Sequence, residues 1–320
     1  MNHNIKFKKD DIVKVLFMGT PEFARESLKA LANSEYDICG VFTQPDKPKG
    51  RGYKLAFSPV KEFALENGLK VFQPSKLKTG EAFEIIKDLD PDIIVVVAYG
   101  KILPKEIIDF PKYGCVNVHG SLLPKYRGAA PIQWSVINGE TKTGVTTMYM
   151  DEGLDTGDML LKESVDVLPN ETSGELYERL SKIGANLLIK TLNKIEDGTI
   201  LSEKQNDDDF TYAPMLSKDM ALIDWTKSAK KIHDLVRGLN PWPITYSYIG
   251  GKRLKIYKTE VLDNYQGLPG EIVNISPLIV ACGDNTALKI LEVQYEGKKR
   301  MKSEDFLRGY KVEPNMKLGE

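Results

Sequence analysis

Short β-branched or apolar runs alternate with helix-like stretches through the first half of the chain, and this alternation restricts the fold more than any other feature of the sequence. The runs predict strands at 13–17, 38–43, 93–98, 114–119 and 144–149. The intervening stretches predict helices at 22–34, 60–67 and 82–89, and a longer amphipathic helix at 173–196. Strands that alternate with helices form a parallel sheet covered on both faces, so we predict an α/β domain.

The pattern changes after residue 196. Residues 197–216 are rich in Asp, Asn, Gly, Ser and Thr, which is typical of a linker. One amphipathic helix follows at 227–239, and turns then separate five short predicted strands at 244–249, 254–262, 271–275, 278–282 and 287–295. Such spacing favours a small β-barrel. A length of 320 residues also favours two domains. We therefore expect a flexible leader at 1–11, an α/β domain at 12–196, a linker at 197–216 and a barrel at 217–320.

The composition indicates a protein of the cytoplasm. It is 42% hydrophobic and 28% charged, with no apolar run near the roughly 20 residues of a membrane span. The lysine-containing start lacks the apolar core of a secretory signal. Cys39, Cys115 and Cys282 lie far apart without metal-ligand spacing, which favours reduced thiols over disulfides.

Charge is distributed unevenly, although the chain as a whole carries only −1. From Ser217 onward there are 17 Lys and Arg against 13 Asp and Glu, a net of +4, while the rest of the chain carries −5. A small positive excess of this kind suits a domain that contacts phosphates but does not require one.

The predicted strand at 114–119 carries two polar side chains, Asn117 and His119. The twofold period of a strand places both on one face. An amide and an imidazole side by side at the carboxyl end of a parallel strand suit acid/base catalysis and stabilisation of an oxyanion. A histidine with a purely structural role is an equal alternative at this point.

Two loops follow predicted strands. Residues 121–132 mix apolar residues with Gly and Pro without periodicity, which suits either a ligand-lining loop or a buried connection to a helix at 132–138. Residues 151–158 form an acidic, Gly-rich stretch in which one carboxylate could serve a site. A simple turn or a weak cation site remains open there, although the spacing does not match a calcium-binding loop.

The segment 43–54 is basic and too rich in Gly and Pro for a helix or strand, so we expect an exposed, mobile loop. Its cations suit contact with phosphates, and a solvated surface loop is the alternative. They are Lys47, Lys49, Arg51 and Lys54. A second basic run contains Lys298, Lys299 and Arg300. The glycine after the first strand, Gly19, begins no G-x-G-x-x-G fingerprint, which argues against a dinucleotide cofactor.

Several segments in this order resemble the methionyl-tRNA formyltransferase family from about Val13 to the end. They are FMGTPEFA at 17–24, TQPDKPKGRG at 43–52, VVVAYGKILP at 95–104, NVHGSLLPKYRGAAPIQW at 117–134, MDEGLDTGDM at 150–159 and RGLNPWP at 237–243. The Asn-x-His pair, with Asp155 further along, is similar to the constellation of folate-dependent formyltransferases in general.

This resemblance implies a role for each catalytic residue. Asn117 would donate its amide to the formyl oxygen, and His119 would stabilise the developing oxyanion as an imidazolium. Asp155 would orient His119 and relay the proton of the attacking amine. The implied reaction moves the formyl group of 10-formyl-tetrahydrofolate to the α-amine of initiator methionyl-tRNA, with no metal.

The resemblance also implies the binding segments. Those for folate would be Ser121, Leu122, Leu123 and Pro124, with Gly100, Lys101, Ile102 and Leu103 beside the pterin. The basic loop would contact the acceptor stem, with Arg51 as its best-matched arginine, and an OB-like C-terminal barrel would hold the tRNA from the other side, after a Rossmann-like catalytic domain. We expect a monomer.

Three other functions are open to the sequence. A formyltransferase for a small amine would use the same catalytic residues but would not need the 43–54 insertion or a basic barrel. A non-catalytic tRNA-binding protein would not need Asn117, His119 and Asp155 together. A dehydrogenase would need the missing glycine fingerprint.

Overall fold

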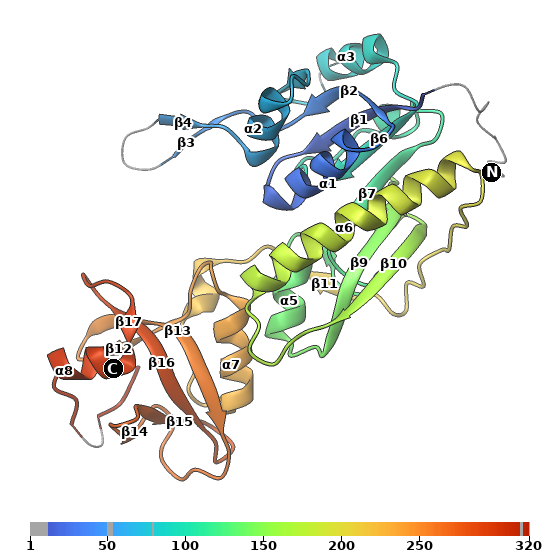
Figure 1. Ribbon diagram of the computed structural model, residues 1–320. Coiled ribbons are helices and arrows are strands. Elements are labelled where there is room, and N and C mark those ends of the chain that lie inside the picture. Colours follow the sequence, from blue (N-terminus) through green and yellow to red (C-terminus); the bar gives the residue numbers. More distant parts are fainter. Residues whose placement is uncertain (1–11, 50–53, 79, 314–315, 320) are drawn as a thin grey trace. The chain divides into compact units, whose positions relative to one another are not determined.

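The computed structural model describes residues 12–49, 54–78, 80–313 and 316–319 (Figure 1). The leader expected at 1–11 lies outside this range. The chain forms two compact units, of which the first comprises Met1–Gly128, Thr143–Val165 and Tyr177–Tyr212. The second comprises Ala129–Lys142, Asp166–Leu176 and Ala213–Glu320. Residues 129–142 and 166–176, which we expected in the catalytic domain, thus cluster with the C-terminal part.

A seven-stranded sheet forms the centre of the first unit, in the order β10-β9-β7-β6-β1-β2-β5. Its strands are β1 (Lys14–Gly19), β2 (Asp37–Phe42), β5 (Val71–Phe72), β6 (Ile93–Val97), β7 (Cys115–His119), β9 (Lys142–Tyr149) and β10 (Met159–Asp166). From β7 to β5 every pair is parallel. The predicted α/β architecture is therefore confirmed.

The expectation of an all-parallel sheet is wrong at one edge, where β9 runs antiparallel to β7. Six consecutive residues of β9 are buried, from Thr143 to Met148. Burial on both faces selects the same β-branched composition whichever way a strand runs, so the sequence of β9 resembles that of a parallel strand. The strand β10, which pairs with it, was not predicted.

Helices cover both faces of this sheet. They are α1 (Glu22–Ala32), α2 (Pro59–Glu66), α3 (Glu81–Leu89), α4 (Lys105–Ile108) and α6 (Ser173–Glu196). The first and last lie on the same face, because the Phe23 ring lies 5.3 Å from the Tyr177 ring (Figure 1). Gly184 lets α6 approach β7, since a Cβ there would lie 3.0 Å from Val118 Cγ1.

The opposite face packs against α3 and α4. Ile86 and Ile107 form one buried cluster there with Leu16 of β1 and Cys115 of β7. Because side chains alternate along a strand, Asn117 and His119 lie on the same face of β7 as Cys115, and Val118 lies on the α6 face.

The basic segment 43–54 differs from the loop that we expected. Its described residues include β3 (Lys47–Lys49) and β4 (Lys54–Ala56), which pair antiparallel as a two-stranded ribbon. Pro48 is tolerated because both strands are edges, where a missing N–H breaks no central ladder. The abundance of Gly and Pro therefore did not exclude strands here.

The second unit is rich in strands, which confirms the predicted smaller sheet domain. Its antiparallel sheet has the order β12-β13-β16-β15-β14, and β17 pairs with β16. The strands are β12 (Tyr246–Ile249), β13 (Lys252–Leu262), β14 (Ile272–Asn274), β15 (Ile279–Ala281), β16 (Ala287–Tyr295) and β17 (Met301–Lys302). The helices are α5 (Pro131–Ile137), α7 (Ala229–Gly238) and α8 (Ser303–Gly309), with a 3₁₀ turn at Lys218–Ala221. Ile232 and Val236 of α7 join the core of this sheet.

No helix in the described part of the chain combines the length and the apolar character that crossing a bilayer requires.

Candidate active site

The carboxyl ends of β1, β6 and β7 lie next to one another at one edge of the parallel sheet, because β6 pairs with both β1 and β7. The chain leaves β1 through α1 toward β2 on one side, and it leaves β6 toward β7 on the other. Such a reversal of strand order opens a crevice for ligands outside the carboxyl ends. His119 is the last residue of β7 and so lies at this edge.

His119 and Asp155 come together there, although 35 residues separate them in the sequence. His119 Nδ1 lies 3.6 Å from Asp155 Oδ2, and the two side chains are 7% and 17% exposed. His119 Nε2 lies 2.9 Å from the carbonyl oxygen of Tyr126. A carbonyl oxygen only accepts, so Nε2 carries a hydrogen and Nδ1 is the nitrogen that faces the carboxylate. Both ring nitrogens thus face acceptor oxygens.

Asp155 is held by a turn and by a backbone donor. Its φ is 54°, in the left-handed region that Asp tolerates better than most residues. Its Oδ2 accepts a hydrogen bond from Gly128 N at 2.9 Å. The segment 126–128 therefore contacts both members of the pair, through the Tyr126 carbonyl and the Gly128 N–H.

Asp151 holds the first part of the acidic loop in a turn. Asp151 Oδ1 accepts hydrogen bonds from Gly153 N at 3.0 Å and from Thr156 Oγ1 at 2.7 Å. Within the described ranges, no three His, Cys, Asp or Glu side chains gather as a metal site. The hydrogen bonds of Asp151 are those of the turn that the sequence left open.

Asn117 precedes His119 by two residues on the same face of β7. Its Oδ1 is buried, and no described residue forms a hydrogen bond with it. A buried polar atom without a partner costs roughly 1–3 kcal/mol, and a ligand that bonds to it would remove that cost. The amide oxygen is thus open to a hydrogen bond from a ligand at this edge.

The two segments expected to bind folate follow the neighbouring strands β6 and β7. Residues 121–124 are fixed by Thr146, whose Oγ1 donates to Ser121 O at 2.7 Å and accepts from Leu123 N at 3.1 Å. In the other segment Ile102 is 78% exposed, which offers an apolar surface to a ring. Gly100, with a φ of 78°, allows the turn that presents it.

Lys101 is the exception in this set. Its ammonium donates to the carbonyl oxygens of Pro74 and Ser75, at 2.5 and 2.8 Å. Burial lowers the pKa of Lys101. Because two of its three donors are already bonded to the backbone, Lys101 stabilises this loop.

Segment 203–212, which we expected to be part of a linker, contributes to the site. Thr211 Oγ1 accepts a hydrogen bond from Tyr126 N at 2.8 Å, and Thr211 O accepts one from Arg127 N at 2.9 Å. Gln205 donates to the backbone of the Asp155 turn. Sequence reasoning missed both residues, because a lone Gln or Thr in a polar stretch carries no periodicity and no motif.

The expected tRNA contacts fall into two groups. On the β3–β4 ribbon, Lys47 is exposed, and Lys49 pairs with Lys54 through the backbone. Arg51 lies outside the described residues. In the second unit Lys298 and Lys299 are exposed. Arg300 already contacts Glu292 and Tyr257 of the same unit.

Arg300 Nε donates to Glu292 Oε2 at 2.7 Å, and its guanidinium lies 4.4 Å from the centre of the Tyr257 ring. A cation that is already paired and stacked is less available to a phosphate than its exposed neighbours.

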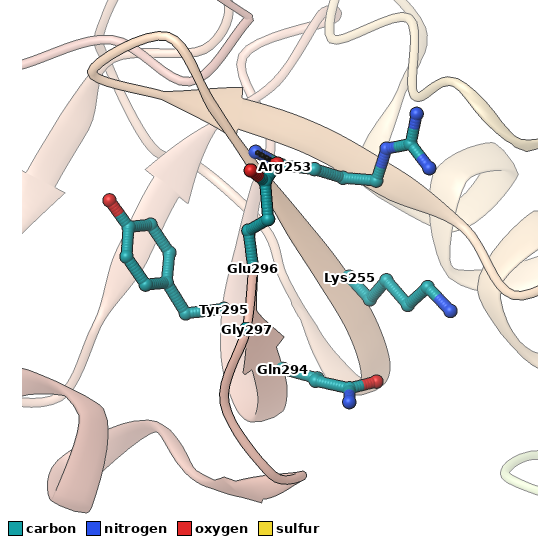
Figure 2. Close-up of a pocket in the computed structure, with 6 residues that line it drawn as sticks. All are labelled: Arg253, Lys255, Gln294, Tyr295, Glu296 and Gly297. Carbon is teal, nitrogen blue, oxygen red and sulfur yellow. Dashed lines mark hydrogen bonds between the residues drawn. The ribbon is translucent and has the colours of Figure 1, made fainter.

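A hollow of about 370 Å³ lies on β13 and β16 of the second unit, and its lining was not predicted. It is lined by Arg253, Lys255, Gln294, Tyr295, Glu296 and Gly297. Figure 2 shows Arg253 and Lys255 extending to one side of the strands while Tyr295 turns to the other. The Arg253 guanidinium also lies 4.6 Å from the centre of the Tyr246 ring. Cations beside aromatic rings on a sheet are typical of surfaces that bind nucleic acids.

The model of the formyl transferase family matches residues 13–192, and that of the formyl transferase C-terminal domain matches residues 215–311. The methionyl-tRNA formyltransferase of Acetivibrio thermocellus is 52% identical over 312 residues, which cover 96% of this chain and 100% of that protein. That of Clostridium novyi is 54% identical over 305 residues, covering 94% and 98%. The chain belongs to the methionyl-tRNA formyltransferase family.

Among solved structures, an N-formyltransferase from Helicobacter canadensis, in complex with folinic acid and dTDP-3-aminofucose, superposes with a TM-score of 0.68. It is 22% identical, and the match covers 89% of this chain and 100% of that one. At this identity the likeness shows the fold alone.

Proposed function

We propose that this chain transfers the formyl group of 10-formyl-tetrahydrofolate to the α-amine of methionyl initiator tRNA, for the initiation of translation. The observation that carries the proposal is the placement of His119 against Asp155, at 3.6 Å, beside an Asn117 oxygen that has no described partner. The relatives from Acetivibrio thermocellus and Clostridium novyi carry the name of this activity at 52% and 54% identity.

Each site residue has a part in this acyl transfer. The lone pair of the acceptor amine forms a C–N bond to the formyl carbon, and negative charge develops on the formyl oxygen. Asn117 Nδ2 donates a hydrogen bond to that oxygen, and the imidazolium of His119 stabilises its charge. Asp155 keeps the imidazolium oriented and takes the proton that the amine loses.

The step is completed when the C–N10 bond of the folate breaks. The electron pair of that bond goes to N10, and the proton held at Asp155 returns there, so the products are the formylated amine and tetrahydrofolate. No charge accumulates on the protein, and the reaction needs no metal.

The donor fits the edge formed by Gly100–Leu103 and Ser121–Pro124. An apolar ring system suits the exposed Ile102, and the hydrogen bonds of Thr146 hold residues 121–124 in place beside it. A folate in the related Helicobacter canadensis structure supports the choice of donor.

The acceptor is a tRNA rather than a small amine. The basic segment with Lys47, Lys49, Arg51 and Lys54 in its sequence belongs to the first unit, and the exposed Lys298 and Lys299, next to Arg300, supply cations on the second unit. Arg253 and Lys255, with Tyr246 nearby, extend that second surface. Cations interleaved with aromatic rings suit a backbone of phosphates and unpaired bases.

We further propose that the enzyme works as a monomer in the cytoplasm. Asn117, His119 and Asp155 all lie in the first unit, so one chain completes the catalytic group. The free thiols Cys39, Cys115 and Cys282 suit a reducing compartment.

The test is transfer of labelled formyl from 10-formyl-tetrahydrofolate to charged initiator methionyl-tRNA, free methionine and small amines, compared side by side. Label on the charged tRNA alone is the expected result. Label on a small amine would identify a same-fold formyltransferase with a different substrate. No transfer to any acceptor would favour a non-catalytic tRNA-binding protein.

A further inference from the structure

We infer that Gln205 is a positioning residue for Asp155, because its side chain forms two hydrogen bonds with the turn that carries the proposed catalytic carboxylate. Gln205 Nε2 donates to the carbonyl oxygens of Asp155 and Gly157, each at 2.8 Å. The inference rests on the proposed function, since it assigns Gln205 a part in the same reaction. All three residues belong to the first unit.

The other end of the Gln205 amide is held by a buried arginine. Gln205 Oε1 accepts a hydrogen bond from Arg127 Nε at 2.9 Å, and Arg127 is only 6% exposed. Arg127 is itself oriented by Asp207, whose Oδ1 lies 2.9 Å from Nη2. The orientation of the amide is therefore not free: its oxygen must face Arg127, and its nitrogen must face the turn.

Only an amide satisfies both neighbours at this position. It accepts one hydrogen bond and donates two, whereas a carboxylate accepts but does not donate. In a Gln205→Glu variant the Arg127 contact would persist, but a negatively charged oxygen would face the carbonyl oxygens of Asp155 and Gly157. The substitution thus affects the turn while it preserves the size of the side chain and its partner.

The turn needs this support because its geometry is both strained and exacting. Asp155 has a φ of 54°, a region that L-residues occupy only where their surroundings hold them. Its carboxylate contacts His119 at 3.6 Å, already longer than a hydrogen bond, so further movement removes the contact. A displacement of about 1 Å in a catalytic group can cost about 10²-fold in rate.

The experiment compares Gln205→Glu and Gln205→Met with wild type in the formyl-transfer assay, with both substrates varied. Gln266→Glu, which makes the same chemical change at an exposed position of the second unit, is the matched control. We expect kcat to fall about 10- to 100-fold in the Gln205 variants, with both KM values within about twofold of wild type. The control should match wild type.

A double-mutant cycle separates positioning from general stability. If Gln205 acts through Asp155, then Gln205→Glu should cause no further loss of kcat in an Asp155→Asn background. The thermal midpoint of unfolding is measured for each variant. The cycle uses the Gln205 variant whose thermal midpoint equals that of the wild type.

Two results would overturn the inference: wild-type kcat in both Gln205 variants, or an undiminished loss in the Asp155→Asn background. Failure of the proposed function itself would look different, because the wild-type protein would then transfer no formyl group to charged tRNA.

Discussion

Removing the charge of Asp155 tests the proposed chemistry most directly. Asp155→Asn keeps the shape of the side chain and an oxygen that can accept from Gly128 N, whose bond to Oδ2 is 2.9 Å long. What it removes is the negative charge 3.6 Å from His119 Nδ1 and the ability to take a proton. The variant therefore separates charge from structure.

The magnitude follows from that distance. Two unit charges 3.6 Å apart interact by about 4.6 kcal/mol at an effective dielectric constant of about 20. Asp155 is partly exposed, so screening reduces this figure, but about 2.7 kcal/mol already corresponds to a factor of about 10² in rate. We expect kcat to fall by about 10² or more, with the KM for folate little changed.

The assay is steady-state formyl transfer to charged initiator tRNA, with single-turnover measurements to isolate the chemical step. Asp158→Asn is the matched control, since it makes the same change three residues further along in the same loop. His119→Ala should show a loss of similar size, because it removes the group that Asp155 supports. Asp155 does not have the proposed role if kcat of Asp155→Asn stays within about threefold of wild type, or if Asp158→Asn loses as much.

Three further predictions concern other parts of the molecule. In Gly157→Ala the new Cβ would lie 1.8 Å from the Tyr149 carbonyl oxygen, so both kcat and the thermal midpoint should fall; an unchanged midpoint would contradict the packing. Burial lowers the pKa of His233 below its ordinary value of 6.5, so the folded state resists protonation. The contribution of the neutral His233 to the free energy of unfolding should thus be complete above pH 6.5 and decline as the pH falls below it. His233→Gln should flatten this decline in denaturant titrations at pH 7.5 and 5.5. Arg51→Ala should lower kcat/KM for charged tRNA and leave the KM for folate unchanged; a raised folate KM would argue against a tRNA role.

Residue types and their spacing were sufficient for much of this description. The alternation of buried runs with amphipathic stretches predicted β1, β2, β6 and β7 and the helices α1, α2, α3 and α6, because periodicity records which side chains are buried. It did not predict β5 or α4, which are too short to show a period. The twofold period of 114–119 placed Asn117 and His119 on one face of β7, and the loops after β6 and β7 were recognised by motifs local to each.

Tertiary structure alone decided the rest. The direction of β9, the pairing of β3 with β4 and the grouping of 129–142 with the second unit all depend on which segments meet, and burial patterns do not record that. The contacts of Gln205 with the Asp155 turn span about 50 residues of sequence and use one amide in an otherwise featureless acidic stretch. A hydrogen-bonding side chain shows no periodicity of its own, so only the fold reveals which backbone it holds.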